Sequence, residues 1–199
     1  FSGFAIVGER IFYIDGAGDL AVQDLPCNGT ATTLLDANDH SINGRSLYGI
    51  GDQLVSVGFR APDQYEIRLH NAGTGAVDEV LLTISGAEVF GPSFFAGDGG
   101  LYWLRFDERT LGLAVVRYSL GGSPQEILTR TLTRALNAGY TVDESRGNVL
   151  VVYMDGFPAS GGEAHFLLYD GIAGEVEELA MDTSFYSQRI FGTQFLVLE

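Results

Sequence analysis

Residues 69–80 read Leu-His-Asn-Ala-Gly-Thr-Gly-Ala-Val-Asp-Glu-Val, and residues 168–179 read Leu-Tyr-Asp-Gly-Ile-Ala-Gly-Glu-Val-Glu-Glu-Leu. Leu, an Asx residue, Gly, Val, Glu and an aliphatic residue recur in the same frame, ninety-nine residues apart. Self-similarity at a fixed offset is typical of repeat architectures, and it decides the fold class before local propensity does.

The ninety-nine-residue offset spans two repeat units. Short apolar runs begin at Ile11, Leu54, Leu101, Val149 and Phe195, at separations of 43, 47, 48 and 46 residues. The runs are rich in β-branched and aromatic residues and are bounded by Gly, Asp, Asn and Ser, so they are predicted to be strands joined by tight turns. Each unit holds about four such segments, which is typical of a β-propeller blade.

The repeat divides the chain into units of residues 1–42, 43–90, 91–137 and 138–185, with a partial unit at 186–199. Residues 129–137 have helix propensity, but the repeat places them at the end of an outer strand. The expected strands are residues 4–7, 10–15, 20–25 and 31–36; 46–50, 53–59, 65–71 and 77–84; 93–96, 101–106, 113–120 and 125–132; 139–142, 148–155, 164–170 and 176–181; 189–193 and 194–199.

A family resemblance rests on residues 166–176, Phe-Leu-Leu-Tyr-Asp-Gly-Ile-Ala-Gly-Glu-Val. This phrase resembles one common in generic β-propeller blades of the WD40-like, YVTN-like and TolB-like families, and no subfamily signature accompanies it. The resemblance implies one all-β domain over residues 1–199, a β-propeller of four-stranded antiparallel blades, with four full blades and a partial fifth. Propellers serve as enzymes, adhesins, sensors and scaffolds, so the fold implies no function.

The fifth unit is incomplete, because residues 189–199 supply only two strands. An uncovered sheet edge favours association with another chain. Three explanations stay open: the chain is part of a larger ring, a partner chain completes it, or four or five irregular blades close on themselves.

Composition excludes several classes of partner and site. The net charge is −15 and all 11 basic residues are Arg, so a phosphate backbone or an anionic membrane surface is repelled. No apolar run approaches the roughly 20 residues needed to cross a bilayer, so no membrane insertion is expected. Cys27 is the only cysteine, which excludes an intramolecular disulfide and a cysteine-based metal site.

The absence of Lys is typical of GC-rich bacterial genomes. The chain opens at Phe1 without Met, either because a leader has been removed or because the chain is an excised piece. We expect an extracytoplasmic bacterial protein, located in the periplasm, on the cell surface or outside the cell.

The expected innermost strands argue against catalysis. They contain no Asp, Glu or His, whereas glycoside hydrolysis needs two carboxylates about 5 to 10 Å apart. No catalytic residue is therefore assigned, and the chain is expected not to be an enzyme. The alternative is a hydrolase or lyase with catalytic groups on loops, for which Asp36, His40, Asp107 and Glu163 are the candidates.

No metal or cofactor is expected. Residues 36–40 begin like a calcium-binding loop, but His40 stands where an oxygen ligand is needed and Ser41 where Gly is needed. The acidic residues that follow the inner strands lie next to Gly, as tight turns require. No Gly-rich loop leads into a helix, so a phosphate-binding loop is not predicted.

The connections that share one face of such a fold carry aromatic and Arg residues, which are common in binding hot spots. We expect a non-catalytic binding or assembly module that recognises a protein or a glycan through this loop face. A structural subunit that binds copies of itself is a further alternative. The expected binding residues are His40, Arg60, Arg109, Phe157 and Tyr186.

Overall fold

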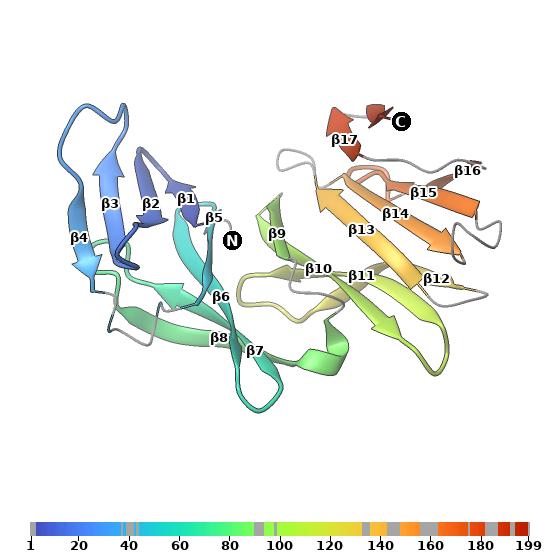
Figure 1. Ribbon diagram of the computed structural model, residues 1–199, viewed down its shortest axis with the longest axis horizontal. Helices are drawn as coiled ribbons and strands as arrows, with labels where there is room; N and C mark the ends of the chain where they lie inside the picture. The colour runs from blue at the N-terminus through green and yellow to red at the C-terminus, as the bar shows by residue number, and fades with distance from the viewer. Residues whose placement is uncertain are drawn as a thin grey trace. The chain divides into compact units, whose positions relative to one another are not determined.

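A computed structural model gives the fold of the chain (Figure 1). It consists of antiparallel strands and one short 3₁₀ helix, η1 (Gly86–Glu88), within the described residues. The chain divides into two compact units, an N-terminal unit of Phe1–Gly86 and a C-terminal unit of Ala87–Glu199. The structure describes residues 3–36, 38, 42, 44–89, 94–97, 99–132, 136–142, 148–155, 163–174, 176–181, 187–191 and 194–198.

The N-terminal unit contains two four-stranded antiparallel sheets in sequence order, which we call sheet 1 and sheet 2. Sheet 1 comprises β1 (Phe4–Val7), β2 (Arg10–Ile14), β3 (Leu20–Asp24) and β4 (Thr32–Leu35). Sheet 2 comprises β5 (Ser46–Ile50), β6 (Gln53–Arg60), β7 (Gln64–His70) and β8 (Val77–Ser85).

The C-terminal unit repeats this arrangement in sheet 3 and sheet 4 and adds a two-stranded sheet. Sheet 3 comprises β9 (Phe94–Gly97), β10 (Gly100–Asp107), β11 (Gly112–Ser119) and β12 (Gln125–Thr131). Sheet 4 comprises β13 (Leu136–Val142), β14 (Val149–Asp155), β15 (Glu163–Tyr169) and β16 (Val176–Met181). The two-stranded sheet pairs β17 (Ser187–Phe191) with β18 (Gln194–Leu198).

Sheets 1 and 2 pack on each other, with buried apolar side chains of both sheets between them. Strand β1 lies beside β5. Gly49 in β5 lies against the backbone of β1, where an added Cβ would meet the carbonyl oxygen of Ile6 at 2.0 Å. The buried core between the sheets comprises Ala5, Val7, Phe12, Leu20, Ile42, Leu47 and Leu54.

The C-terminal unit has its own core. Strand β9 lies beside β13, and β17 contacts both β13 and β14. The core spans sheets 3 and 4, so each unit is built by stacking one four-stranded sheet on the next. Its buried residues are Tyr102, Leu104, Leu113, Val115, Leu128, Leu132, Val149, Val151 and Leu167.

The all-β prediction and the repeated four-stranded antiparallel sheets are confirmed. Most strand ends agree with the repeat within one or two residues. Strand β13 starts at Leu136, three residues before the predicted start, and η1 was not expected. The grouping of residues 1–199 into a single domain stays a prediction.

Candidate functional site

A row of polar residues lies on one face of sheet 2. Successive side chains of a strand point to opposite faces, so Glu66, Arg68 and His70 of β7 share a face. The register pairs Gly58 with Glu66 and Ser56 with Arg68, which brings β6 residues onto the same face. Ser56, Glu66 and His70 are buried, at 0%, 2% and 3% exposure. Buried polar groups of this kind need hydrogen-bond partners.

Arg45 reaches this face from the residue that precedes β5. Its side chain is 5% exposed and crosses the position opposite Glu66. Gly58 provides the room, because a Cβ added there would lie 2.4 Å from Cγ of Arg45. The side chain of Arg45 can therefore lie across the sheet only because residue 58 has no Cβ.

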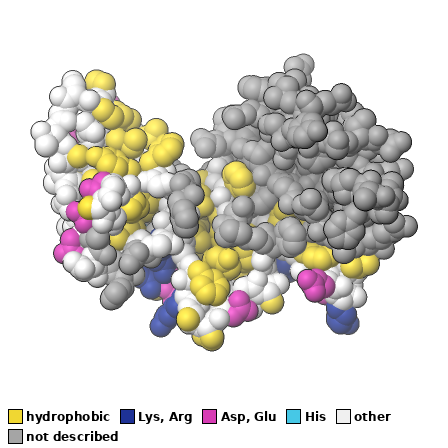
Figure 2. Space-filling model, in the orientation of Figure 1, with side chains coloured by type: hydrophobic (Ala, Val, Ile, Leu, Met, Phe, Trp, Pro, Cys, Tyr) yellow, Lys and Arg dark blue, Asp and Glu magenta, His cyan; other side chains and the backbone are white. Residues whose placement is uncertain are grey.

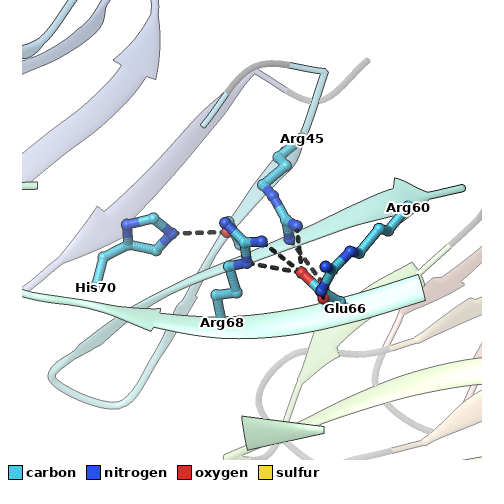
Figure 3. A network of polar contacts seen from close by, with 6 residues as sticks. Arg45, Arg60, Glu66, Arg68 and His70 are labelled. Carbon is cyan, nitrogen blue, oxygen red and sulfur yellow. Dashed lines mark hydrogen bonds and ion pairs between the residues drawn. The ribbon is translucent and has the colours of Figure 1, made fainter. Parts of the chain in front are cut away.

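Three arginines converge on the carboxylate of Glu66, which is 3% exposed (Figure 3). Arg45 donates from Nη2 to Oε2 at 3.1 Å and from Nη1 to the Glu66 backbone oxygen at 2.8 Å. Arg60 donates from Nη1 to Oε1 at 2.5 Å. Arg68 donates to Oε2 from Nε at 2.9 Å and from Nη2 at 2.5 Å. Charge-assisted bonds are stronger than neutral ones, so the carboxylate is firmly held.

The electrostatics of this Arg45–Arg60–Glu66–Arg68 cluster follow from burial and charge. Burial raises the pKa of Glu66. The hydrogen bonds and charges of Arg60 and Arg68 lower it by more, so the pKa falls to about 2. Burial and the nearby charge of Arg68 lower the pKa of Arg45 to about 10, although Glu66 raises it. Glu66 is therefore ionised at neutral pH, and the cluster carries three positive charges for one negative charge.

His70 joins the same face to the turn between β7 and β8. Its Nδ1 lies 2.7 Å from the carbonyl oxygen of Gly75, which can only accept, so Nδ1 carries the proton. In the neutral ring Nε2 then accepts from the hydroxyl of Ser56 at 2.7 Å. A Ser–His pair can generate a nucleophile, but Ser56 is 0% exposed, so this pair is closed to a substrate.

The hairpin that joins β6 to β7 carries the exposed end of the cluster, and we call residues 59–65 the β6–β7 hairpin. It projects away from the rest of its unit in Figure 1. The Arg60 side chain is 64% exposed and Phe59 is 58% exposed. Phe59 packs edge-on against Tyr65, with ring centroids 5.4 Å apart. Figure 2 shows hydrophobic and arginine side chains together at the corresponding end of the unit.

The structure describes two of the five expected binding residues. Arg60 lies at the end of β6 in the N-terminal unit, and Arg109 lies in the β10–β11 turn of the C-terminal unit. His40, Phe157 and Tyr186 lie outside the described residues. The shared loop face of these five residues therefore stays a prediction.

Of the four candidates for loop-borne catalysis, the structure describes the side chains of Asp36 and Asp107, one in each unit. Asp36 is exposed and accepts the backbone N–H of Asn38 at 2.8 Å. Asp107 lies in the C-terminal unit, where backbone N–H groups of Arg109 and Thr110 donate to it at 2.8 and 3.3 Å. The hydrogen bond from the backbone N–H of Arg109 is the main reason why the pKa of Asp107 is lowered, as expected for a turn. Glu163 is the first residue of β15, but its side chain is not described. His40 lies outside the described residues.

The described residues contain neither a metal-binding cluster nor a membrane-spanning helix. No group of three or more His, Cys, Asp or Glu side chains there is arranged to hold a metal ion. No helix in the same part of the chain has the length and apolar character that a membrane span requires.

Sequence reasoning named Arg60 but missed Arg45, Glu66 and Arg68. A signal was present in β7, where Glu66, Arg68 and His70 occupy alternate positions between Tyr65, Ile67 and Leu69. Alternation places oppositely charged residues on one face. Arg45 carried no such signal, because only the folded chain brings it to Glu66.

No protein-family model matches the chain, and no curated protein matches it.

Proposed function

We propose that this chain is a non-catalytic binding module that recognises a protein or a glycan through its exposed loops. The observation that carries the proposal is the β6–β7 hairpin, which exposes an aromatic ring and a guanidinium on adjacent residues, Phe59 and Arg60. Aromatic and Arg side chains dominate binding hot spots.

Preorganisation supports this role. Arg60 is bonded to Glu66, a carboxylate fixed by two further arginines, and Phe59 is packed against Tyr65. Side chains that are already ordered lose less conformational entropy when a partner binds. The hairpin therefore offers two contact residues at a reduced entropic cost.

We further propose that the four-stranded sheets are β-propeller blades of an extracytoplasmic protein. The stacking of sheet 1 on sheet 2, with β1 beside β5, and of sheet 3 on sheet 4, with β9 beside β13, supports this fold. Binding through loops at one face is a common use of such scaffolds.

The test is a binding screen of the purified chain against peptide and glycan arrays, with hits measured by isothermal titration calorimetry. Phe59→Ala and Arg60→Ala should each weaken binding by about tenfold or more. Val80→Ala is the control, because Val80 is also an exposed apolar residue, 47% exposed, and lies on β8 outside the hairpin. Hits that bind all three variants as tightly as the wild type would refute this role for the hairpin.

A second candidate function is self-association through sheet 1. Cross-strand register places Phe4 opposite Tyr13 and Ile6 opposite Ile11, on the face turned away from the core. Phe4 and Ile6 are 58% and 52% exposed. Hydrophobic side chains gather in this region in Figure 2. Exposed apolar patches commonly mark interaction sites.

Solution mass measured by light scattering tests this second candidate. Self-association predicts a dimer or larger species for the wild type and a monomer of about 21 kDa for a Phe4→Glu, Ile6→Glu double variant. A wild type that stays monomeric at high concentration would exclude it and leave the binding proposal unaffected.

A further inference from the structure

The Arg45–Arg60–Glu66–Arg68 cluster is locally positive in an acidic chain. Three guanidinium groups surround one carboxylate, so these four side chains carry a net charge of +2, whereas the whole chain carries −15. Arg45 and Arg68 are largely buried, at 5% and 19% side-chain exposure, so solvent screens them weakly. A second anion at this point would be attracted by both excess charges.

Arg60 is the member of the cluster that a second anion can reach. Its side chain is 64% exposed, and its contact with the described residues is the single Nη1 bond to Oε1 of Glu66. The edge formed by Nε and Nη2 is a planar pair of parallel N–H donors, and this pair matches the two oxygens of a carboxylate. Figure 3 shows Arg60 entering the cluster from a different strand than Arg68.

We propose that Arg60 binds a carboxylate side chain of a protein partner, while Glu66 orients Arg60 and the buried Arg45 and Arg68 strengthen the attraction. This inference rests on the proposed binding function and specifies its ligand. Arg60 makes the contact, and the other three residues act through it as positioning residues.

A carboxylate suits this site better than a phosphate. The surrounding chain is strongly negative, so a ligand with one negative charge is repelled less than one with two. The single exposed guanidinium edge supplies two donors, which satisfy the two carboxylate oxygens.

A protein suits the hairpin better than an acidic sugar. Phe59 and Arg60 are consecutive strand residues, so their side chains leave the hairpin on opposite faces. A partner that contacts both must enclose the tip of the hairpin. A groove in a folded protein can offer an apolar pocket to one face and an Asp or Glu to the other.

The first experiment measures the site directly by NMR of the arginine Nε–Hε groups in the full chain. The chain has 11 arginines and no lysine, and an Arg60→Gln variant assigns the Arg60 signal. The probe is N-acetyl-glutamate amide, and N-acetyl-glutamine amide is the uncharged control. We expect a saturable shift at Arg60 with the glutamate probe, with an apparent affinity about tenfold tighter than at Arg109. Arg109 is the matched control, because it is exposed and lies in a turn outside the cluster.

Three outcomes would overturn the inference. Equal responses at Arg60 and Arg109 would mean that the cluster adds nothing to an ordinary surface arginine. A response of the same size to the glutamine probe would mean that charge is not recognised. Tighter binding of methyl glucuronide or inorganic phosphate than of the glutamate probe would assign the site to a sugar acid or a phosphate.

A second experiment separates this inference from the proposed function. For any protein partner found in the binding screen, Arg60→Gln should weaken binding about tenfold. Arg60→Lys should lose less than Arg60→Gln but still bind more weakly than the wild type, because Lys keeps the charge but lacks the planar pair of N–H donors. If Phe59→Ala weakens binding and Arg60→Gln does not, the carboxylate inference fails while the binding function stands. If neither variant matters, both fail.

Discussion

Replacing Glu66 by glutamine removes the one negative charge from the cluster while keeping the size of the side chain. Burial raises the pKa of this carboxylate, but the hydrogen bonds and charges of Arg60 and Arg68 outweigh it and lower the pKa from the ordinary 4.5 to about 2. At about 1.4 kcal/mol per pKa unit, this drop corresponds to about 3 kcal/mol favouring the ionised form in the folded chain. We therefore expect Glu66→Gln to lower the free energy of unfolding by about 3 kcal/mol at neutral pH.

The effect should depend on pH in a defined direction. Because the pKa of Glu66 is lowered in the folded state, its contribution is fully present above the unfolded value of 4.5 and is lost as the pH falls toward 2. The difference in unfolding free energy between wild type and Glu66→Gln should shrink across this range and vanish only below about pH 2.

Urea unfolding followed by far-ultraviolet circular dichroism at several pH values measures both quantities. Glu126→Gln is the matched control, since Glu126 pairs with Arg105 at the surface, with side chains 40% and 37% exposed. Exposed pairs contribute at most about 1 kcal/mol. A Glu66→Gln loss no larger than that of Glu126→Gln, or a loss that persists unchanged in acid, would refute this account of the cluster.

Gly49→Ala should destabilise the N-terminal unit by about 3 kcal/mol, because the new Cβ meets the Ile6 carbonyl oxygen at 2.0 Å. Thermal unfolding checks this against Gly16→Ala, where nothing lies within 4 Å; equal melting temperatures would contradict the packing of β1 on β5. Ser56→Ala should cost about 1 to 3 kcal/mol, because it removes the buried partner of His70 Nε2. Urea unfolding measures this loss, and an unchanged midpoint would show that the hydroxyl contributes nothing.

The strands were predictable because their signal is local. A short apolar run bounded by turn residues recurs at 43 to 48 residues, and β1 and β5 start and end where this repeat places them. The start of β13 was predicted less well, because no turn residue marks Leu136. The sequence analysis placed Arg60 in a connection, whereas the structure places it at the end of β6, and nothing in the sequence indicated its bond to Glu66.

The sequence by itself determined the all-β class, the four-strand repeat and the net charge of −15, because periodicity and composition are properties of the chain alone. Only the tertiary structure decided that Arg45, 21 residues away, pairs with Glu66 through the gap that Gly58 leaves. The physical reason is that an ion pair depends on distance and burial. Both arise only when β5, β6 and β7 pack into one sheet and exclude water from its inner face.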